Sequence, residues 1–211
     1  MNLITSGLQM HPDVRVYQGG KVVGNNTLAS ILIGDFALGS ILDPLGVMLL
    51  NVWKPKARNQ WVIKSLAIGI VGRQSVFEPL QTGILAIDSM IPIGRGQREL
   101  ILGDRYTGKS SIGLDAILNQ RFEKVLCVCV SIGQKASSIL EVFLSLLRRD
   151  AVKYLIHIVA SGSSSSASQF ISPYTGTSVS EFFMLLRECS CLILQDDLSK
   201  HAVAYREIYL L

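Results

Sequence analysis

The chain has 211 residues, of which 49% are hydrophobic and 17% are charged, and its formal net charge is +4. This size allows one domain with a large core, or one domain with part of another. The charge is small and no basic run alternates with aromatic residues, so nucleic-acid binding is not indicated. Charged residues and Pro44 interrupt the longest apolar region, residues 28–50, and no secretory signal precedes it. We therefore expect a soluble chain without a membrane span.

The first part of the chain has the pattern of strands and turns. Residues 14–50 are rich in β-forming residues and glycine, and residues 28–33 give the clearest strand. Residues 51–64 indicate an exposed connection. Its Trp53 and Trp61, beside three basic residues, could stack on the bases of a single strand. Because the cluster is short, we expect instead a solvated loop with two packing anchors.

From residue 81 onward, segments with helical spacing alternate with apolar runs. The spacing predicts helices over residues 81–91, 135–149 and 179–188, and another that begins near Ser199. The apolar runs predict strands over residues 100–102, 125–131, 154–160 and 191–194, and the serine-rich residues 161–168 indicate a surface loop. This alternation predicts an α/β fold with a mostly parallel sheet that is covered on both faces.

The strongest motif is Gly-Asp-Arg-Tyr-Thr-Gly-Lys-Ser at residues 103–110, between an apolar strand pattern and a helical one. This is the pattern of a phosphate-binding loop, in which backbone N–H groups and a helix N-terminus face the phosphates. We predict that Lys109 binds the β- and γ-phosphates and that Ser110 ligates magnesium. A chance glycine-rich turn is the alternative. The predicted binding residues in the loop are Gly103, Asp104, Arg105, Tyr106, Thr107, Gly108, Lys109 and Ser110.

Two further residues extend this site to other strands. Asp196 closes the apolar run 191–194, so we predict that it holds magnesium together with Ser110. Asp197 is predicted to cap the following helix. Gln134 follows strand 125–131, where hydrolysis would need a carboxylate to activate water. An amide can orient water but cannot deprotonate it, so the sequence favours nucleotide binding over rapid cleavage. Glutamine positions water in some GTPases, which leaves cleavage open.

The four cysteines form two Cys-x-Cys pairs, at positions 127 and 129 and at positions 189 and 191. If their strands were neighbours, four thiolates could bind a metal, although the usual zinc spacing is Cys-x-x-Cys. Free cysteines often behave as small core residues. We expect this second role.

Several segments together resemble the alpha subunit of F-type ATP synthases, especially the chloroplast form. They are residues 75–101, 103–110, 117–120, 132–138, 173–176 and 196–200, with an earlier matching segment at residues 38–46. The resemblance covers most of the chain from about residue 18. It implies a RecA-like nucleotide-binding domain with a non-catalytic Mg-ATP, in a ring that alternates with beta subunits around a central stalk. Gln134 falls where beta subunits carry the catalytic glutamate.

The chain also departs from these subunits, which are more than twice its length. Tyr106 stands where the family has glutamine, and the later sheet strands and the C-terminal helical domain have no counterpart. We expect residues 1–25 to be a remnant of the N-terminal β-barrel region. Residues 26–211 should form a P-loop domain that is incomplete at its C-terminal side, with residues 100–102 as an apolar edge. A split subunit, a truncated copy and a degenerate product all fit.

The resemblance implies a regulatory, nucleotide-binding subunit or fragment of a proton-transporting ATP synthase. Its implied partners are beta subunits, the central stalk and a complementing C-terminal alpha fragment. It would lie on an energy-transducing membrane, at the stromal face of the plastid thylakoid, with the mitochondrial inner membrane and the bacterial plasma membrane as other locations. Two alternatives remain. An autonomous P-loop ATPase would need a carboxylate base and a complete sheet, and a non-binding fragment would only pack against beta subunits.

Overall fold

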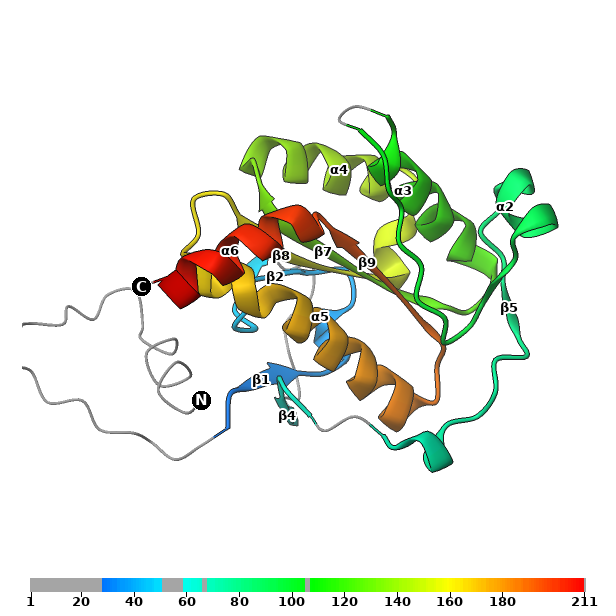
Figure 1. Ribbon diagram of the computed structural model, residues 1–211, viewed down its shortest axis with the longest axis horizontal. Helices are drawn as coiled ribbons and strands as arrows, with labels where there is room; N and C mark the ends of the chain where they lie inside the picture. Colours follow the sequence, from blue (N-terminus) through cyan, green and yellow to red (C-terminus); the bar gives the residue numbers. More distant parts are fainter. Residues whose placement is uncertain (1–27, 51–58, 66–67, 105–106, 211) are drawn as a thin grey trace, which may run out of the picture.

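The centre of the molecule is a five-stranded sheet (Figure 1). A computed structural model describes residues 28–50, 59–65, 68–104 and 107–210, so the expected barrel remnant 1–25 lies outside the described residues. The strand order is β3 (Met48–Leu50), β2 (Ile41–Leu42), β8 (Leu155–Ser161), β7 (Leu126–Gln134) and β9 (Cys191–Asp196). Only β3 is antiparallel to its neighbour. The prediction of an α/β fold with a mostly parallel sheet is therefore confirmed.

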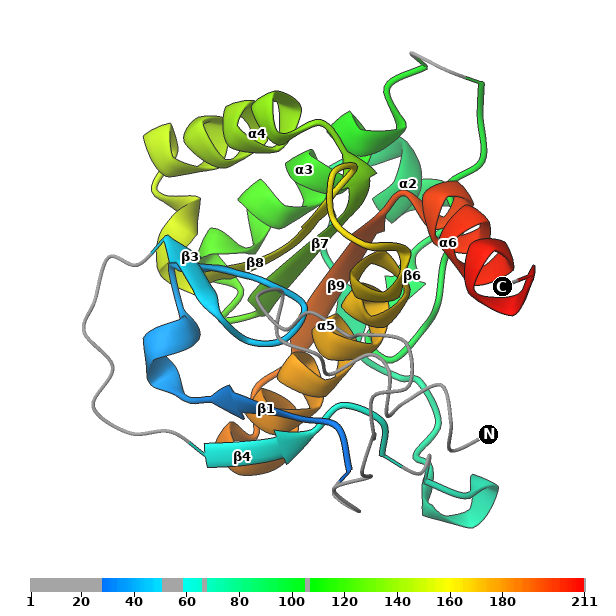
Figure 2. The same ribbon diagram turned by 90° about the vertical axis from the view of Figure 1, so that its left-hand side faces the viewer.

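Helices cover both faces of this sheet (Figures 1 and 2). One face carries α3 (Lys109–Asn119) and α4 (Ala136–Arg148), and the other carries α5 (Ser166–Arg187) with α6 (Leu198–Leu210) packed beside it. Strands β7 and β8 are apolar along most of their length because both of their faces are buried. The predicted elements at 125–131, 135–149, 154–160 and 191–194 appear as β7, α4, β8 and β9, with ends that differ by at most three residues.

The smaller elements lie at the margins of the sheet. They are the strands β1 (Ser30–Ile33), β4 (Asn59–Val62), β5 (Pro79–Leu80) and β6 (Ile93–Gly94), the helix α2 (Leu85–Met90), and the 3-10 turns η1 (Asp35–Ala37), η2 (Ile70–Gly72), η3 (Gln120–Phe122) and η4 (Ala151–Tyr154). The strand predicted over residues 28–33 is β1. It pairs with β4 in a separate two-stranded ribbon beside α5 (Figure 2).

The pairing of β1 with β4 corrects the expected loop at residues 51–64. Residues 59–62 are a strand, and Trp61 lies half-buried with its ring edge-on to Phe182 at 5.6 Å between centroids. Trp61 is therefore a packing anchor, whose ring joins the ribbon to α5. Trp53 lies outside the described residues.

Helix α5 is much longer than predicted, and this corrects the expected surface loop at residues 161–168. The helix begins at Ser166, where the Ser165 side chain accepts a hydrogen bond from the Ser168 N–H. It continues through Pro173, which the sequence pattern had placed outside any helix. Proline cannot donate a backbone hydrogen bond to the carbonyl of Gln169, four residues earlier. The Ser172 hydroxyl donates to that carbonyl at 2.8 Å instead, so the helix passes the proline with the acceptor satisfied.

The strand predicted at residues 100–102 is wrong. These residues have no strand structure, and Leu100 and Leu102 are 64% and 82% exposed. A strand needs a neighbour for its backbone hydrogen bonds, and among the described residues β9 pairs with β7 alone. The edge strands of the described sheet are therefore β3 and β9, and residues 100–102 do not form an edge.

The helix predicted over residues 81–91 is shorter, because its first residues form a turn. The Asp88 carboxylate accepts hydrogen bonds from the Thr82 hydroxyl at 2.6 Å, the Thr82 N–H at 3.0 Å and the Gly83 N–H at 2.8 Å. The bond from the Thr82 hydroxyl is the main reason that the pKa of Asp88 is lowered. Asn119 and Gln120 donate to the carbonyls of Thr82 and Gln81, both at 2.7 Å. The turn is thus tied to the end of α3.

The cysteines face opposite sides of the sheet. Cys127 and Cys129 are buried under α3 and α4, whereas the Cys191 thiol contacts the Ser180 carbonyl of α5 at 3.6 Å. Burial raises the pKa of Cys129 to about 12, so this thiol is protonated at neutral pH. Cys127 and Cys129 cannot share a metal ion with Cys191, because the sheet lies between them. The expected role of Cys127 and Cys129 as buried free thiols is confirmed, while Cys189 and Cys191 are both half-buried.

A histidine is buried in the centre of the sheet. His157 on β8 is fully buried, its Nε2 lies 2.8 Å from the Ser131 hydroxyl, and its Nδ1 has no partner. Its ring stacks on Phe143 of α4 at 6.2 Å. Burial disfavours the imidazolium and lowers the pKa of His157 to about 4. The folded protein therefore holds this residue neutral.

We expect the stability of the protein to fall when the pH is lowered from about 6.5 to about 4, because unfolded His157 binds a proton in this range and folded His157 does not. The loss from this residue should reach about 3 kcal/mol at the acid end of the range. Urea denaturation at several pH values, on the wild type and His157→Gln, measures it. The difference in unfolding free energy between the two proteins should shrink as the pH falls. A difference that stays constant with pH would contradict the prediction.

Candidate functional site

The phosphate-binding motif lies where the chain enters α3. The helix begins at Lys109, and Gly108 before it has a φ of +86°, the left-handed conformation that glycine adopts without strain. No atom lies within 4 Å of the position that a Cβ on Gly108 would occupy, so the space in front of the helix is open. The free backbone N–H groups of the first turn and the positive end of the helix dipole face this space. Arg105 and Tyr106 lie outside the described residues.

Two hydrogen bonds connect the residues of the phosphate-binding motif to one another next to the start of α3. The Thr107 hydroxyl donates to the Asp104 carbonyl at 2.8 Å, and the Lys109 ammonium donates to the Gly103 carbonyl. The Lys109 side chain therefore lies along the inside of the loop. The arrangement places one positive charge beside the open N-terminus of the helix.

Ser110 and Asp196 meet although 86 residues separate them. The Ser110 hydroxyl donates to the Asp196 carboxylate at 2.6 Å. Asp196 is the last residue of β9, and Ser110 is in the first turn of α3. The helix can approach the strand closely because Gly113 has no side chain. A Cβ at this position would lie only 2.5 Å from the Leu194 side chain. The two residues predicted to hold magnesium are thus brought together.

Gln134 lies at the same edge of the sheet. It ends β7, and its amide nitrogen lies 3.4 Å from the Asp196 carbonyl oxygen, a long hydrogen bond. The backbone carbonyl of Gln134 accepts a hydrogen bond at 2.9 Å from the N–H of Gly162, which lies in the loop after β8. The carboxyl ends of β7, β8 and β9 therefore converge around this glutamine.

Asp197 has a separate role from its neighbour. Its carboxylate accepts a hydrogen bond from the Ser199 N–H at 2.6 Å, at the start of α6. This confirms the prediction that Asp197 caps the helix. The Asp196 side chain faces Ser110 instead.

Two residues that the sequence patterns did not single out also reach this edge. A Cβ on Gly133 would lie 3.0 Å from the Cβ of Lys200 and 3.1 Å from the side-chain oxygen of Gln169. Lys200 follows Asp196 by four residues, in the first turn of α6, and is exposed. Its place one turn after a strand-terminal aspartate was the available sequence signal. It adds a second positive charge near Gln134.

The glutamates before and after β7 in the sequence do not reach this edge. Glu123 lies before β7, at the end of the strand opposite to Gln134, where its carboxylate is 4.0 Å from Arg95. Glu141 is exposed on the outer side of α4. The edge with Ser110 and Asp196 therefore presents Gln134 where a base would be needed.

The site suits a magnesium nucleotide. A hydroxyl oxygen and a carboxylate oxygen 2.6 Å apart are the kind of ligands that Mg²⁺ takes from a protein, with water and phosphate oxygens completing its shell. The open helix N-terminus and Lys109 suit the phosphates. Among the described residues, no group of three or more His, Cys, Asp or Glu side chains could hold a metal by itself.

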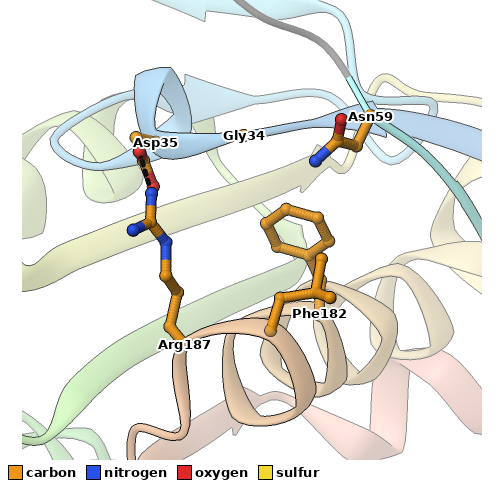
Figure 3. A pocket seen from close by; sticks show the side chains of 6 residues that line it. Gly34, Asp35, Asn59, Phe182 and Arg187 are labelled. Atoms are coloured by element: carbon orange, nitrogen blue, oxygen red, sulfur yellow. Dashed lines mark hydrogen bonds and ion pairs between the residues drawn. The ribbon is translucent and has the colours of Figure 1, made fainter.

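A separate hollow of about 230 Å³ lies between the β1–β4 ribbon and α5 (Figure 3). Figure 3 shows the Arg187 side chain reaching from the end of α5 to Asp35, with which it forms an ion pair, while Phe182 lies beneath Asn59. The two charges compensate each other, and the volume is below the roughly 300–1,000 Å³ of small-molecule sites. We interpret this region as a structural junction between the ribbon and α5.

The chain matches one protein-family model. Residues 83–211 match the nucleotide-binding domain of the ATP synthase alpha/beta family. The match covers more than half of the chain, so the protein belongs to this family. The parallel sheet, with the P-loop at the start of α3, is the RecA-like P-loop fold of that domain. Among the described residues, no helix is long and apolar enough to cross a membrane.

Proposed function

We propose that this member of the ATP synthase alpha/beta family is an alpha-type subunit, or part of one, that binds Mg-ATP or Mg-ADP without hydrolysing it rapidly. The observation that carries the proposal is the 2.6 Å contact between Ser110 and Asp196, beside Lys109 at the start of α3. Membership of the family supports nucleotide binding and a place in a complex with partner subunits. The alpha-type, non-catalytic role is our inference from Gln134 and from the motifs.

The loop residues would hold the phosphates. The backbone of residues 103–110 would donate N–H groups, and Lys109 would leave the Gly103 carbonyl to bind phosphate oxygens. Ser110 and Asp196 would hold the magnesium ion, which neutralises phosphate charge when it is bound. The full proposed set is Gly103, Asp104, Arg105, Tyr106, Thr107, Gly108, Lys109, Ser110, Gln134 and Asp196.

Gln134 supports binding without rapid cleavage. A catalytic base must take a proton from the attacking water, and an amide cannot do so at neutral pH. Gln134 lies beside Asp196, and in the proposed complex it would hydrogen-bond a water near the terminal phosphate. Its position therefore supports a site that retains its nucleotide.

The proposed setting is an energy-transducing membrane, which the chain would reach through its complex. We propose beta subunits and a central stalk as partners, with the plastid thylakoid as the first location and mitochondrial or bacterial membranes as the others. The open β9 edge and the exposed Leu100 and Leu102 support cover by a further chain, such as a complementing alpha fragment. The division into a barrel remnant, residues 1–25, and a P-loop domain from residue 26 belongs to this proposal.

We expect the purified chain to bind Mg-ATP with measurable heat in calorimetry and to release phosphate at a negligible rate from the same samples. The reason is that the proposed site has residues to bind phosphate and magnesium, but it has Gln134 where a catalytic base would be needed. Turnover near the roughly 10 per second of typical enzymes, lost in Lys109→Ala, would favour an autonomous ATPase. No heat of binding from a folded chain would favour the non-binding fragment.

A further inference from the structure

A buried serine lies beside the aspartate of the proposed magnesium site. Strands β7 and β9 pair in parallel, and Ser131 on β7 is the register partner of Asp196 on β9. Side chains alternate between the two faces of a strand, and Cys129, two residues before Ser131, faces α3 and α4 (Figure 2). Asp196 contacts Ser110 of α3, so the Ser131 and Asp196 side chains lie on the same face of the sheet. They are neighbours there, because adjacent strands are only about 4.8 Å apart.

His157 lies on the other side of Ser131, on strand β8. Ser131 and His157 are 4% and 0% exposed, and the imidazole Nε2 lies 2.8 Å from the serine hydroxyl oxygen. A serine and a histidine at this distance also occur in nucleophilic hydrolases. Here the hydroxyl is too deeply buried for a substrate to reach it, and the His157 ring stacks on Phe143 of α4. The pair therefore acts inside the protein, and not on a substrate.

The unpaired Nδ1 of His157 indicates where the proton of this neutral ring lies. If Nδ1 carried the proton, a buried N–H group would have no acceptor, and such groups are rare in folded proteins. With the proton on Nε2, the ring donates to the Ser131 oxygen, and only a lone pair stays without a partner. The Ser131 O–H is then available to donate to a second acceptor.

Two acceptors flank the Ser131 hydroxyl on this face. The first is the Cys129 thiol, whose pKa is raised to about 12 by burial and, to a lesser degree, by the negative charge of Asp196. This thiol is protonated at neutral pH and is a weak acceptor. The second is the Asp196 carboxylate, and hydrogen bonds to a carboxylate are roughly twice as strong as those to a neutral acceptor. Among the described side chains, Ser110 donates to the Oδ2 atom of this carboxylate, which leaves Oδ1 for Ser131.

We propose that Ser131 is a positioning residue for magnesium binding, whose hydroxyl is held by His157 and donates to the Asp196 carboxylate. The inference rests on the proposed function, because it concerns the support of the proposed magnesium ligand. A hydrogen bond of this kind fixes the direction of a metal ligand, and its loss typically lowers metal affinity by about 10–100-fold. We therefore expect Ser131 to affect the contribution of magnesium and not the binding of the phosphates, which Lys109 and the loop would hold.

Calorimetric titration of the full chain with ATP, once with excess Mg²⁺ and once with EDTA, tests the proposal. The ratio of the two dissociation constants measures how much magnesium strengthens binding. Ser131→Ala should reduce this ratio about tenfold and change the constant in EDTA by less than about threefold. His157→Val should reduce the ratio as well. The double variant should have the ratio of Ser131→Ala, because both residues act through the same hydrogen bond to Asp196.

Cys129→Ala is the matched control, because it removes a small buried side chain from the same face of β7. It should leave the ratio unchanged, and urea denaturation identifies any loss of ratio that comes from unfolding. An unchanged ratio in Ser131→Ala, or an equal reduction in Cys129→Ala, would overturn the inference. If Ser131→Ala does not fold, an unchanged ratio in His157→Val would do the same.

The experiment also separates this inference from the proposed function. A folded wild-type chain that binds ATP neither with Mg²⁺ nor with EDTA would overturn both. Binding that Lys109→Ala abolishes, with a ratio that Ser131→Ala and His157→Val leave unchanged, would support the site and remove only the role of Ser131.

Discussion

Replacing Lys109 with alanine should abolish the binding of Mg-ATP. The Lys109 ammonium lies inside the loop, where it donates to the Gly103 carbonyl. With phosphate present it would make charge-assisted hydrogen bonds, each worth about 1.5–3 kcal/mol. Loss of two such bonds should weaken binding at least about a hundredfold, while the fold stays intact because the side chain has no role in the core.

Isothermal titration calorimetry on the wild type and Lys109→Ala measures this loss directly. Lys153→Ala is the matched control, because Lys153 is an exposed lysine in η4 whose ion pair, with Asp150 at 3.6 Å, lies away from residues 103–110 in the sequence. This control should bind Mg-ATP as the wild type does. Equal affinity in the wild type and in Lys109→Ala would remove the assignment of the site to residues 103–110.

Replacing Phe183 with alanine should lower the unfolding free energy by about 3–5 kcal/mol, a large part of the stability of a single domain. Phe183 of α5 is almost fully buried in the cluster between this helix and the sheet. Its ring packs edge-on to Phe182 at 5.2 Å. Truncation removes the buried apolar surface and leaves a cavity that the sheet, held by its backbone hydrogen bonds, can fill only in part.

Urea denaturation followed by circular dichroism checks this value. Leu185→Ala on the same helix is the control, because this exposed leucine should change the unfolding free energy by less than about 0.5 kcal/mol. Asp196 ends β9, the strand after α5, and it is held in place only in the folded chain. Phe183→Ala should therefore also weaken the apparent binding of Mg-ATP under conditions in which part of the variant is unfolded. A loss of stability no greater than that of the control would show that α5 is not packed as described.

Local sequence pattern was enough for the features that depend on neighbouring residues. The glycines, Lys109 and Ser110 of the loop act through backbone turns and a helix start, which a few consecutive residues determine. Strand β7 and helix α4 were found because a buried strand and an amphipathic helix have different apolar periods. The capping of α6 by Asp197 is similarly local.

The errors concern segments whose structure depends on a distant partner. Residues 59–62 became a strand because β1 lies beside them, and residues 100–102 did not because no described strand does. The serines at residues 161–168 indicated a loop, yet α5 begins at Ser166 and passes Pro173, where the Ser172 hydroxyl satisfies the Gln169 carbonyl. For residues 59–62 and 100–102 the deciding contact lies outside the short window that a periodicity or composition pattern examines, whereas at Pro173 it is local but is not visible in residue composition.

The sequence by itself determined the phosphate-binding loop, the alternation of strands and helices, and the absence of a carboxylate at position 134. Only the tertiary structure decided that Ser110 meets Asp196, that the cysteine pairs face opposite sides of the sheet, and that His157 is buried with one nitrogen unpaired. The physical reason is the range of the interactions. Turns, caps and apolar periods act over a few residues, whereas parallel strands become neighbours only after a helical crossover, so their side chains meet only in the folded sheet.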